Sequence, residues 1–188
     1  MRLFVALTLP WEVEDALSHL QASLPAGHPV PAENLHLTLA FLGELTSREA
    51  EDVHDQLAGI RAAPVALTLA GVDRFGDARA RSVHAGVEGN AALSHLQEKV
   101  ARAARMAGVD LARRRFKPHV TIARLSGKRV EPRLDRWVAE HGLFRFGPFW
   151  VEDFALMRSD LGGGGPVYSD LATYPLDGEA APAEAPLR

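Results

Sequence analysis

Hydrophobic positions along the chain repeat with periods of about two and about 3.6 residues, which are typical of strands and helices. Alternating or continuous apolar runs predict strands over residues 3–9, 36–43, 65–70, 82–87, 119–124, 149–157 and 167–174. Apolar residues spaced three and four apart predict helices over residues 11–24, 47–62, 91–107 and 133–140. Strands and helices are mixed without a regular βαβ alternation, so the pattern predicts an α+β fold.

Two of the predicted helices carry clear start signals. Thr46 and Glu49 have the spacing of a capping box, in which the threonine and the glutamate satisfy each other's backbone N–H groups. Asn90 can accept a hydrogen bond at the start of the helix over residues 91–107, and Gly108 is suited to end it.

The two strands over residues 36–43 and 119–124 share an unusual polar face. Side chains alternate along a strand, so His36 and Thr38 project from one face while their apolar neighbours project from the other. His119 and Thr121 repeat the same arrangement. A lone histidine in an apolar strand is usually structural, but two matching copies indicate a site built from two halves.

This set of residues suits acid–base chemistry on a phosphodiester. Two imidazoles with ordinary pKa values near 6.5 can hold opposite protonation states, one as base and one as acid. Two threonine hydroxyls can donate hydrogen bonds to the non-bridging oxygens of a tetrahedral anion. One histidine would activate water and the other would protonate the leaving alkoxide, so no metal ion is required.

Arg124, five positions after His119, could bring a cation to the same anion. Its odd spacing from Thr121 would turn it to the opposite face of a regular strand, so a bulge or a strand end must intervene if it is a ligand. Another histidine, His84, lies in the predicted strand over residues 82–87 and is expected to be structural.

Charge is unevenly distributed along the chain. The whole chain carries a formal net charge of −3, but the segment from Lys99 to Arg136 holds twelve Lys or Arg and only three acids. Such a segment could attract a ligand that carries phosphate, or it could simply be a solvated basic surface.

Composition excludes several classes of protein. The 188 residues include no cysteine, which excludes disulfides and a thiolate nucleophile, and no apolar run approaches the ~20 residues of a membrane span. The N-terminus lacks the layout of a signal peptide. We therefore expect a cytoplasmic protein with no membrane partner. Residues 177–188 are small, acidic and rich in proline, and are expected to form a disordered tail.

Other catalytic chemistries find less support. Zinc held by two histidines would need a third protein ligand, which neither strand supplies nearby. A G-x-S-x-G nucleophile elbow and a G-x-x-x-x-G-K-[ST] loop are both missing from the sequence. The glycine run over residues 162–165 is expected to be a hairpin loop.

The motifs HLTL and HVTI resemble the two H-x-T-x signatures of the 2H phosphoesterase superfamily. The flanking stretches RLFVALTLP, NLHLTLAFLGEL, FKPHVTIAR and LMRSDLGGGGPVYSDLATYPL narrow the resemblance to the RNA 2′,3′-cyclic phosphodiesterases, also called 2′-5′ RNA ligases. The matches extend from Arg2 to Leu176.

The resemblance implies a bilobal, pseudo-two-fold fold with two antiparallel sheets and flanking helices around a central groove, formed by residues 1–176 as one domain. It implies hydrolysis of RNA 2′,3′-cyclic phosphate ends to 2′-phosphomonoesters without a metal or other cofactor. By motif position, His36 would be the proton donor and His119 the proton acceptor. Thr38 and Thr121 would hold the phosphate, and Arg124 would bind the substrate.

The resemblance also implies RNA as the partner, with tRNA fragments among the candidates, and 2′-5′ ligation as the reverse reaction. We expect a monomer. Two alternatives stay open: a phosphodiesterase that acts on another 2′-5′ or cyclic nucleotide, and a protein that binds RNA ends without catalysis.

Overall fold

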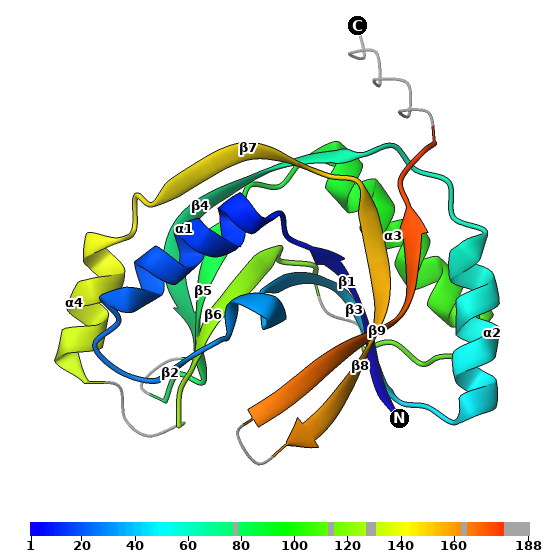
Figure 1. Ribbon diagram of the computed structural model, residues 1–188, viewed down its shortest axis with the longest axis horizontal. Helices are drawn as coiled ribbons and strands as arrows, with labels where there is room; N and C mark the ends of the chain where they lie inside the picture. Colours follow the sequence, from blue (N-terminus) through cyan, green and yellow to red (C-terminus); the bar gives the residue numbers. More distant parts are fainter. Residues whose placement is uncertain (77–78, 113–114, 127–130, 163–164, 179–188) are drawn as a thin grey trace, which may run out of the picture.

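The computed structural model describes residues 1–76, 79–112, 115–126, 131–162 and 165–178 (Figure 1). Its strands are β1 (Arg2–Thr8), β2 (His28–Pro29), β3 (His36–Glu44), β4 (Val65–Phe75), β5 (Ser82–Val87), β6 (His119–Arg124), β7 (Arg145–Val151), β8 (Asp153–Gly162) and β9 (Gly165–Pro175). Its helices are α1 (Trp11–Ala22), α2 (Ser47–Ala58), α3 (Ala91–Met106) and α4 (Pro132–Glu140), with a 3-10 turn, η1 (Ala32–Asn34). The predicted α+β class is confirmed.

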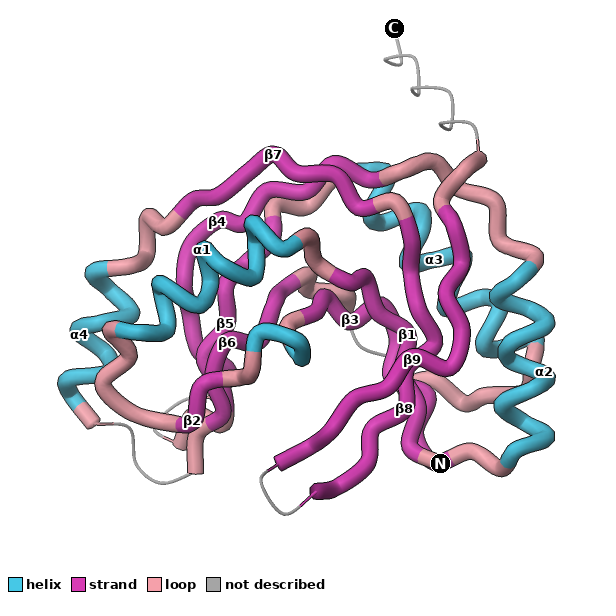
Figure 2. The backbone as a smooth tube through the Cα atoms, in the orientation of Figure 1, coloured by secondary structure: helices cyan, strands magenta, loops and turns pink. Residues whose placement is uncertain are grey.

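The described strands form a single antiparallel sheet with the order β7-β4-β5-β6-β3-β1-β8-β9, and β2 pairs with β6. The strands β7, β4, β5 and β6 make one half of this sheet, and β3, β1, β8 and β9 make the other. The halves meet where Leu37 of β3 pairs with Val120 of β6. The two expected sheets are therefore two halves of one sheet, which curves strongly from one half to the other (Figure 2).

The helices cover the outer faces of the halves. Helices α1 and α4 lie beside the half that contains β6, and α2 and α3 lie beside the half that contains β3 (Figure 1). The buried apolar side chains of both halves and of the helices join in one cluster. A smaller cluster, made of Phe4, Ala6, Ala155 and Met157, lies on the other face of β1 and β8.

The predicted starts of α2 and α3 are confirmed, whereas α2 ends at Ala58 instead of the predicted residue 62. The hydroxyl oxygen of Thr46 accepts from the backbone N–H of Glu49 at 3.3 Å, and the Glu49 carboxylate accepts from the Thr46 N–H at 2.8 Å. The Asn90 side chain accepts from the backbone N–H of Leu93 at 2.8 Å. Gly108 follows α3 with a φ of +86°, a conformation that glycine adopts without strain.

The predicted strand over residues 149–157 is wrong in one respect. The chain breaks at Glu152 into two strands, β7 and β8, which lie in different halves of the sheet. β7 is an edge strand that pairs with β4, whereas β8 lies between β1 and β9. Glu152 and Asp153 interrupt the apolar run at this point, but the hydrophobic pattern does not show that the two segments pair with different neighbours.

Several predicted features fall outside the described residues. These are the tail from residue 179 onward, Gly163 and Gly164 of the glycine run, and part of the basic segment at residues 113–114 and 127–130. The first and last residues of the glycine run, Gly162 and Gly165, pair with each other, as expected for a hairpin. None of the helices in the described ranges combines the length and the apolar composition that crossing a membrane requires.

We propose that residues 1–176 form one domain, because both halves share the buried cluster. Unfolding in urea should then be a single transition, with the same midpoint by far-ultraviolet circular dichroism and by the fluorescence of Trp137, which is buried in α4. Trp11 and Trp150 are exposed, so their replacement by phenylalanine isolates the Trp137 signal. Two separate midpoints would show that the halves are independent domains.

Candidate active site

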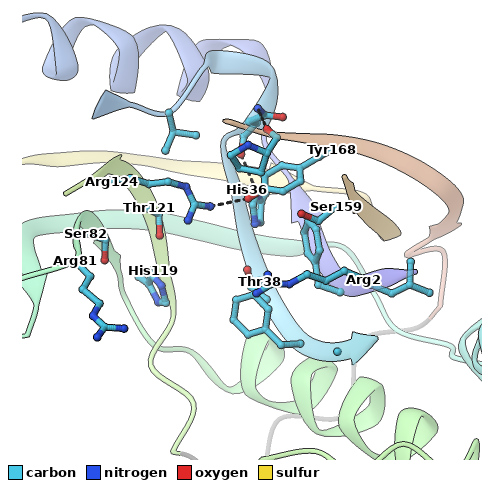
Figure 3. A pocket seen from close by; sticks show the side chains of 17 residues that line it. Arg2, His36, Thr38, Arg81, Ser82, His119, Thr121, Arg124, Ser159 and Tyr168 are labelled. Atoms are coloured by element: carbon cyan, nitrogen blue, oxygen red, sulfur yellow. Dashed lines mark hydrogen bonds between the residues drawn. The ribbon is translucent and has the colours of Figure 1, made fainter. Parts of the chain in front are cut away.

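The two predicted motifs lie side by side where the half-sheets meet. Leu37 and Val120, the pair that joins β3 to β6, are the central residues of the motifs. The histidine and threonine of each motif therefore project from the same face, into one pocket (Figure 3). The pocket is lined by Arg2, Leu3, Phe4, Val30, Asn34, His36, Thr38, Phe41, Gly43, Arg81, Ser82, His119, Thr121, Arg124, Ser159, Pro166 and Tyr168. All five predicted site residues are among them.

The two imidazoles are held in the same way. The Nδ1 atom of His36 lies 2.7 Å from the carbonyl oxygen of Asn34, and the Nδ1 atom of His119 lies 2.8 Å from the carbonyl oxygen of Lys117. A carbonyl can only accept, so Nδ1 carries the hydrogen in both rings. The Nε2 atom of each neutral ring is therefore left as a base that can take up and return a proton.

Each motif is followed by a β-bulge. Along β3, the register with β1 shifts at Leu39 and Ala40, and both side chains are buried. Along β6, the register with β5 shifts at Ile122 and Ala123, which are also both buried. The extra residue returns the next side chain to the face of the motif, so Arg124 lines the pocket. The bulge that the spacing of Arg124 required is present.

A glutamine from a helix supports each bulge. The Gln21 amide in α1 donates to the carbonyl oxygens of Ile122 at 2.6 Å and of Val30 at 2.8 Å. The Gln97 amide in α3 donates to the carbonyl oxygen of Leu39 at 3.3 Å. A bulge frees backbone groups from the strand ladder, and buried carbonyls need a new donor. Gln97 supplies one for Leu39, and Gln21 adds a second donor for the Ile122 carbonyl, which also accepts from the backbone N–H of Val30 at 2.9 Å.

The surroundings of the two imidazoles differ. The ring of His36 packs against Phe4, with centroids 4.9 Å apart, and edge-on against Tyr168 at 5.2 Å. His119 packs edge-on against Phe75 at 4.7 Å and against His84 at 5.2 Å. The side of the pocket at His36 is thus the more aromatic one, since Phe41 also lines it.

His84 is a buried neighbour of His119, and the two rings pack edge to face. The His84 side chain is only 2% exposed and stacks on Phe75 with ring centroids 4.0 Å apart. Burial lowers the pKa of His84 to about 4, with further lowering by the positive charges of His119 and Lys117, and the ring is neutral near pH 7. These contacts agree with the structural role expected from the sequence, as a packing partner of His119.

Burial also lowers the pKa values of the two pocket histidines. For His36, burial is the largest cause, the hydrogen bond to Asn34 opposes it, and the charges of Arg124 and His119 lower the pKa further. For His119, the hydrogen bond to Lys117 opposes burial and the Lys117 charge adds to the lowering. Both rings therefore lose their proton more readily than a free imidazole.

The pocket presents positive charge. Among the described residues, its lining contains three arginines, Arg2, Arg81 and Arg124, and neither aspartate nor glutamate. The Arg124 guanidinium donates to the hydroxyl oxygen of Tyr168 at 2.7 Å, a bond that reaches from one half of the sheet to the other (Figure 3). Arg124 is also the only basic side chain of the predicted basic segment that lines the pocket among the described residues.

Several pocket residues were not predicted. Tyr168 and Ser159 come from the β8–β9 hairpin, and Arg2 and Phe4 come from β1. The two hairpin residues lie far from either motif in sequence. Only the pairing of β8 with β1 and of β9 with β8 places them in the pocket. In β1, the alternation of Arg2 and Phe4 with buried residues already put both on the face opposite the core.

The arrangement can transfer protons on two sides of an anion and can bind that anion through hydroxyl and guanidinium groups. Within the described residues, no three histidine, cysteine, aspartate or glutamate side chains are grouped so that they could hold a metal ion.

A family model for the 2′-5′ RNA ligase superfamily matches residues 8–163. The chain belongs to this superfamily. A protein of Thermus thermophilus named RNA 2′,3′-cyclic phosphodiesterase is 38% identical, with 95% of this chain and 92% of the relative covered. The protein of the same name from Escherichia coli is 34% identical, with 93% of this chain and 96% of the relative covered. The family resemblance drawn from the motifs is confirmed.

Solved structures support the same assignment. The crystal structure of TT0787 of Thermus thermophilus superposes with a TM-score of 0.78 at 34% identity, with 95% of this chain and all of that chain covered. Escherichia coli LigT complexed with 3′-AMP gives a TM-score of 0.76 at 30% identity, with 94% of this chain and 98% of that chain covered. The fold expected from the resemblance is confirmed.

The glutamine bonds to the bulges can be tested by removing the amide without changing the size of the side chain. Replacement of Gln21 by methionine should lower the free energy of unfolding by about 1–3 kcal/mol, because two buried carbonyls lose a donor. Urea denaturation measures the change. Gln97→Met removes one longer bond and should cost less. An equal or smaller loss for Gln21→Met would contradict the proposed support.

Proposed function

We propose that the protein hydrolyses the 2′,3′-cyclic phosphate ends of RNA to 2′-phosphomonoesters through the acid–base action of His36 and His119. The observation that carries the proposal is the pair of imidazoles, each fixed through Nδ1, that share one positively charged pocket with two threonines. The names of the relatives, RNA 2′,3′-cyclic phosphodiesterase, support the same reaction.

In this mechanism, His119 is the base and His36 is the acid. Nε2 of His119 takes a proton from water as the water oxygen attacks phosphorus. The bond between phosphorus and the ribose 3′-oxygen breaks, and the departing oxygen receives the proton of the His36 imidazolium. The phosphate stays on the 2′-oxygen. Thr38 and Thr121 donate to the non-bridging oxygens, and Arg124 balances their negative charge.

The unequal sides of the pocket support this assignment of acid and base. The leaving oxygen belongs to a nucleoside, so the acid should lie on the side that can hold a ribose and a base. His36 is the imidazole beside Phe4 and Tyr168. The exposed ring of Phe41 and the partly exposed ring of Tyr168 offer faces for stacking. His119 lies on the other side, with Ser82 among the lining residues, and suits the entry of water.

The same site could form a 2′-5′ bond if only the nucleophile changed. If the 5′-hydroxyl of a second RNA took the place of water, the same groups would form a 2′-5′ bond, the reaction named in the superfamily description. We include this ligation in the proposal. Both imidazoles come from one chain, which supports a monomeric enzyme, and we propose that it acts in the cytoplasm on RNA ends such as those of cleaved tRNA.

Removal of either imidazole should abolish turnover but not binding. His36→Ala and His119→Ala should each lower the rate of hydrolysis of an RNA 2′,3′-cyclic phosphate by roughly 10²–10⁴-fold, the usual contribution of a general acid or base. RNA binding should survive, because the threonines and arginines remain. His95→Ala, at an exposed position on α3, is the matched control. A protein that only binds RNA ends would show no turnover in any form.

A sulfur atom in place of the 3′-oxygen separates the two roles. Sulfur leaves without protonation, so it should restore the rate of the variant that lacks the acid, His36→Ala, and not that of His119→Ala. Rescue of His119→Ala alone would reverse the assignment.

The profile of kcat/KM against pH should be bell-shaped, with its maximum below pH 6.5. The base must be neutral and the acid protonated, and burial lowers the pKa of both groups from their ordinary value of 6.5. Activity therefore falls at low pH as His119 gains a proton, and at higher pH as His36 loses one. The profile of kcat should lie at higher pH, because a bound anionic phosphate favours the imidazolium.

Initial rates measured across this range in a constant-ionic-strength buffer check both profiles, and the addition of EDTA should leave them unchanged. A kcat/KM maximum well above pH 7 would contradict the acid–base assignment, and loss of activity in EDTA would indicate a metal-dependent reaction instead.

A further inference from the structure

The pocket holds more positive charge than one cyclic phosphate can use. A 2′,3′-cyclic phosphodiester carries a single negative charge, and in the proposed mechanism Arg124 already faces it. Arg2 and Arg81 line the same pocket, and none of its described lining residues is an aspartate or glutamate. Two exposed arginines in a pocket of a chain with a net charge of −3 indicate a ligand with further negative charge.

Arg2 lies on the same face of β1 as Phe4, which is the face toward the pocket. It stands at the end of the aromatic side of the pocket. Leu3 pairs with Arg158 and Phe4 pairs with Met157, so Arg2 and Ser159 are the next residues on this face (Figure 3). No ion pair or side-chain hydrogen bond of Arg2 occurs among the described residues. The nearby acids are already engaged, since Glu44 pairs with the amino group of Met1 and Asp160 pairs with Arg158.

The distance along β1 suits one nucleotide. Ala6 lies opposite Thr38, where the cyclic phosphate would bind, and Arg2 is four residues further along the same face. Four residues of strand span about 13 Å. A ribose with its 5′-phosphate, met by an extended arginine side chain, covers such a distance. Phe4, buried between the two points, packs against Phe41, whose exposed ring lines the same pocket and can stack on the nucleoside.

We propose that Arg2, with the Ser159 hydroxyl, binds the phosphodiester on the 5′ side of the terminal nucleotide, so that the preferred substrate is an RNA chain rather than a cyclic mononucleotide. This inference rests on the proposed function. It also gives the RNA a direction: the chain enters over β1 and β8 and ends at the two motifs.

Arg81 serves a different side of the pocket. It directly precedes Ser82, which pairs with Arg124 in the half of the sheet that contains His119. In the proposed mechanism water enters on that side, and the 5′ part of a substrate with a cyclic 3′ end does not pass there. Arg81→Gln removes the same charge from the same pocket and is therefore the matched control for Arg2→Gln.

The test compares two substrates, adenosine 2′,3′-cyclic phosphate and the dinucleotide ApA with a 2′,3′-cyclic phosphate end. Arg2→Gln should lower kcat/KM for the dinucleotide about tenfold, the equivalent of one charge-assisted hydrogen bond of about 1.4 kcal/mol, and should lower it less than about twofold for the mononucleotide. Arg81→Gln should change both values by the same factor.

A dinucleotide with a neutral methylphosphonate linkage completes the test. The wild-type protein should lose its preference for the longer substrate, and Arg2→Gln should no longer differ from wild type. An equal loss on all three substrates for Arg2→Gln, or a loss confined to the charged dinucleotide for Arg81→Gln, would overturn the proposal.

Failure of the proposed function would look different, since neither substrate would be turned over by the wild-type protein. Binding of the charged and neutral dinucleotides, measured by calorimetry with wild type and Arg2→Gln, then decides the role of Arg2. Equal affinity of wild type for the two dinucleotides would overturn it.

Discussion

The site depends on the backbone contact between β3 and β6. Leu37 and Val120, both fully buried, form the pair that joins the two halves of the sheet, and each is the central residue of a motif. Because side chains alternate along a strand, burial of these two residues forces the histidines and threonines of both motifs onto the opposite face. The same contact thus closes the core and places two imidazoles in one pocket.

A symmetric framework carries an asymmetric pocket. The two motif strands share the register shift and a supporting glutamine, so Phe41 on β3 occupies the position that Arg124 occupies on β6. Likewise Ala6 faces Thr38, whereas His84 faces Thr121. Different residues at matching positions make one side aromatic and the other polar, which distinguishes the surroundings of two similarly held histidines.

Local features were predictable from the sequence because they depend on neighbouring residues. Alternation placed the motif residues on one face, capping signals placed the starts of α2 and α3, and the spacing of Arg124 required the bulge. The crossing at Glu152 and the presence of Tyr168 in the pocket were not predictable in this way. Both depend on pairings between strands far apart in the sequence, such as β1 with β8, and hydrophobicity along the chain is the same for either pairing.

The position of β8 beside β1 has a consequence during synthesis. Ala6 pairs with Ala155, so one edge of β1 has no partner until most of the chain has left the ribosome. Until then the nascent protein exposes a row of unpaired backbone groups together with the apolar face of Phe4 and Ala6. The half of the sheet that contains β1 is the first to be synthesised and the last to be completed, because β8 and β9 come at the end of the chain. Its open edge is the point at which a newly made chain is most exposed to aggregation.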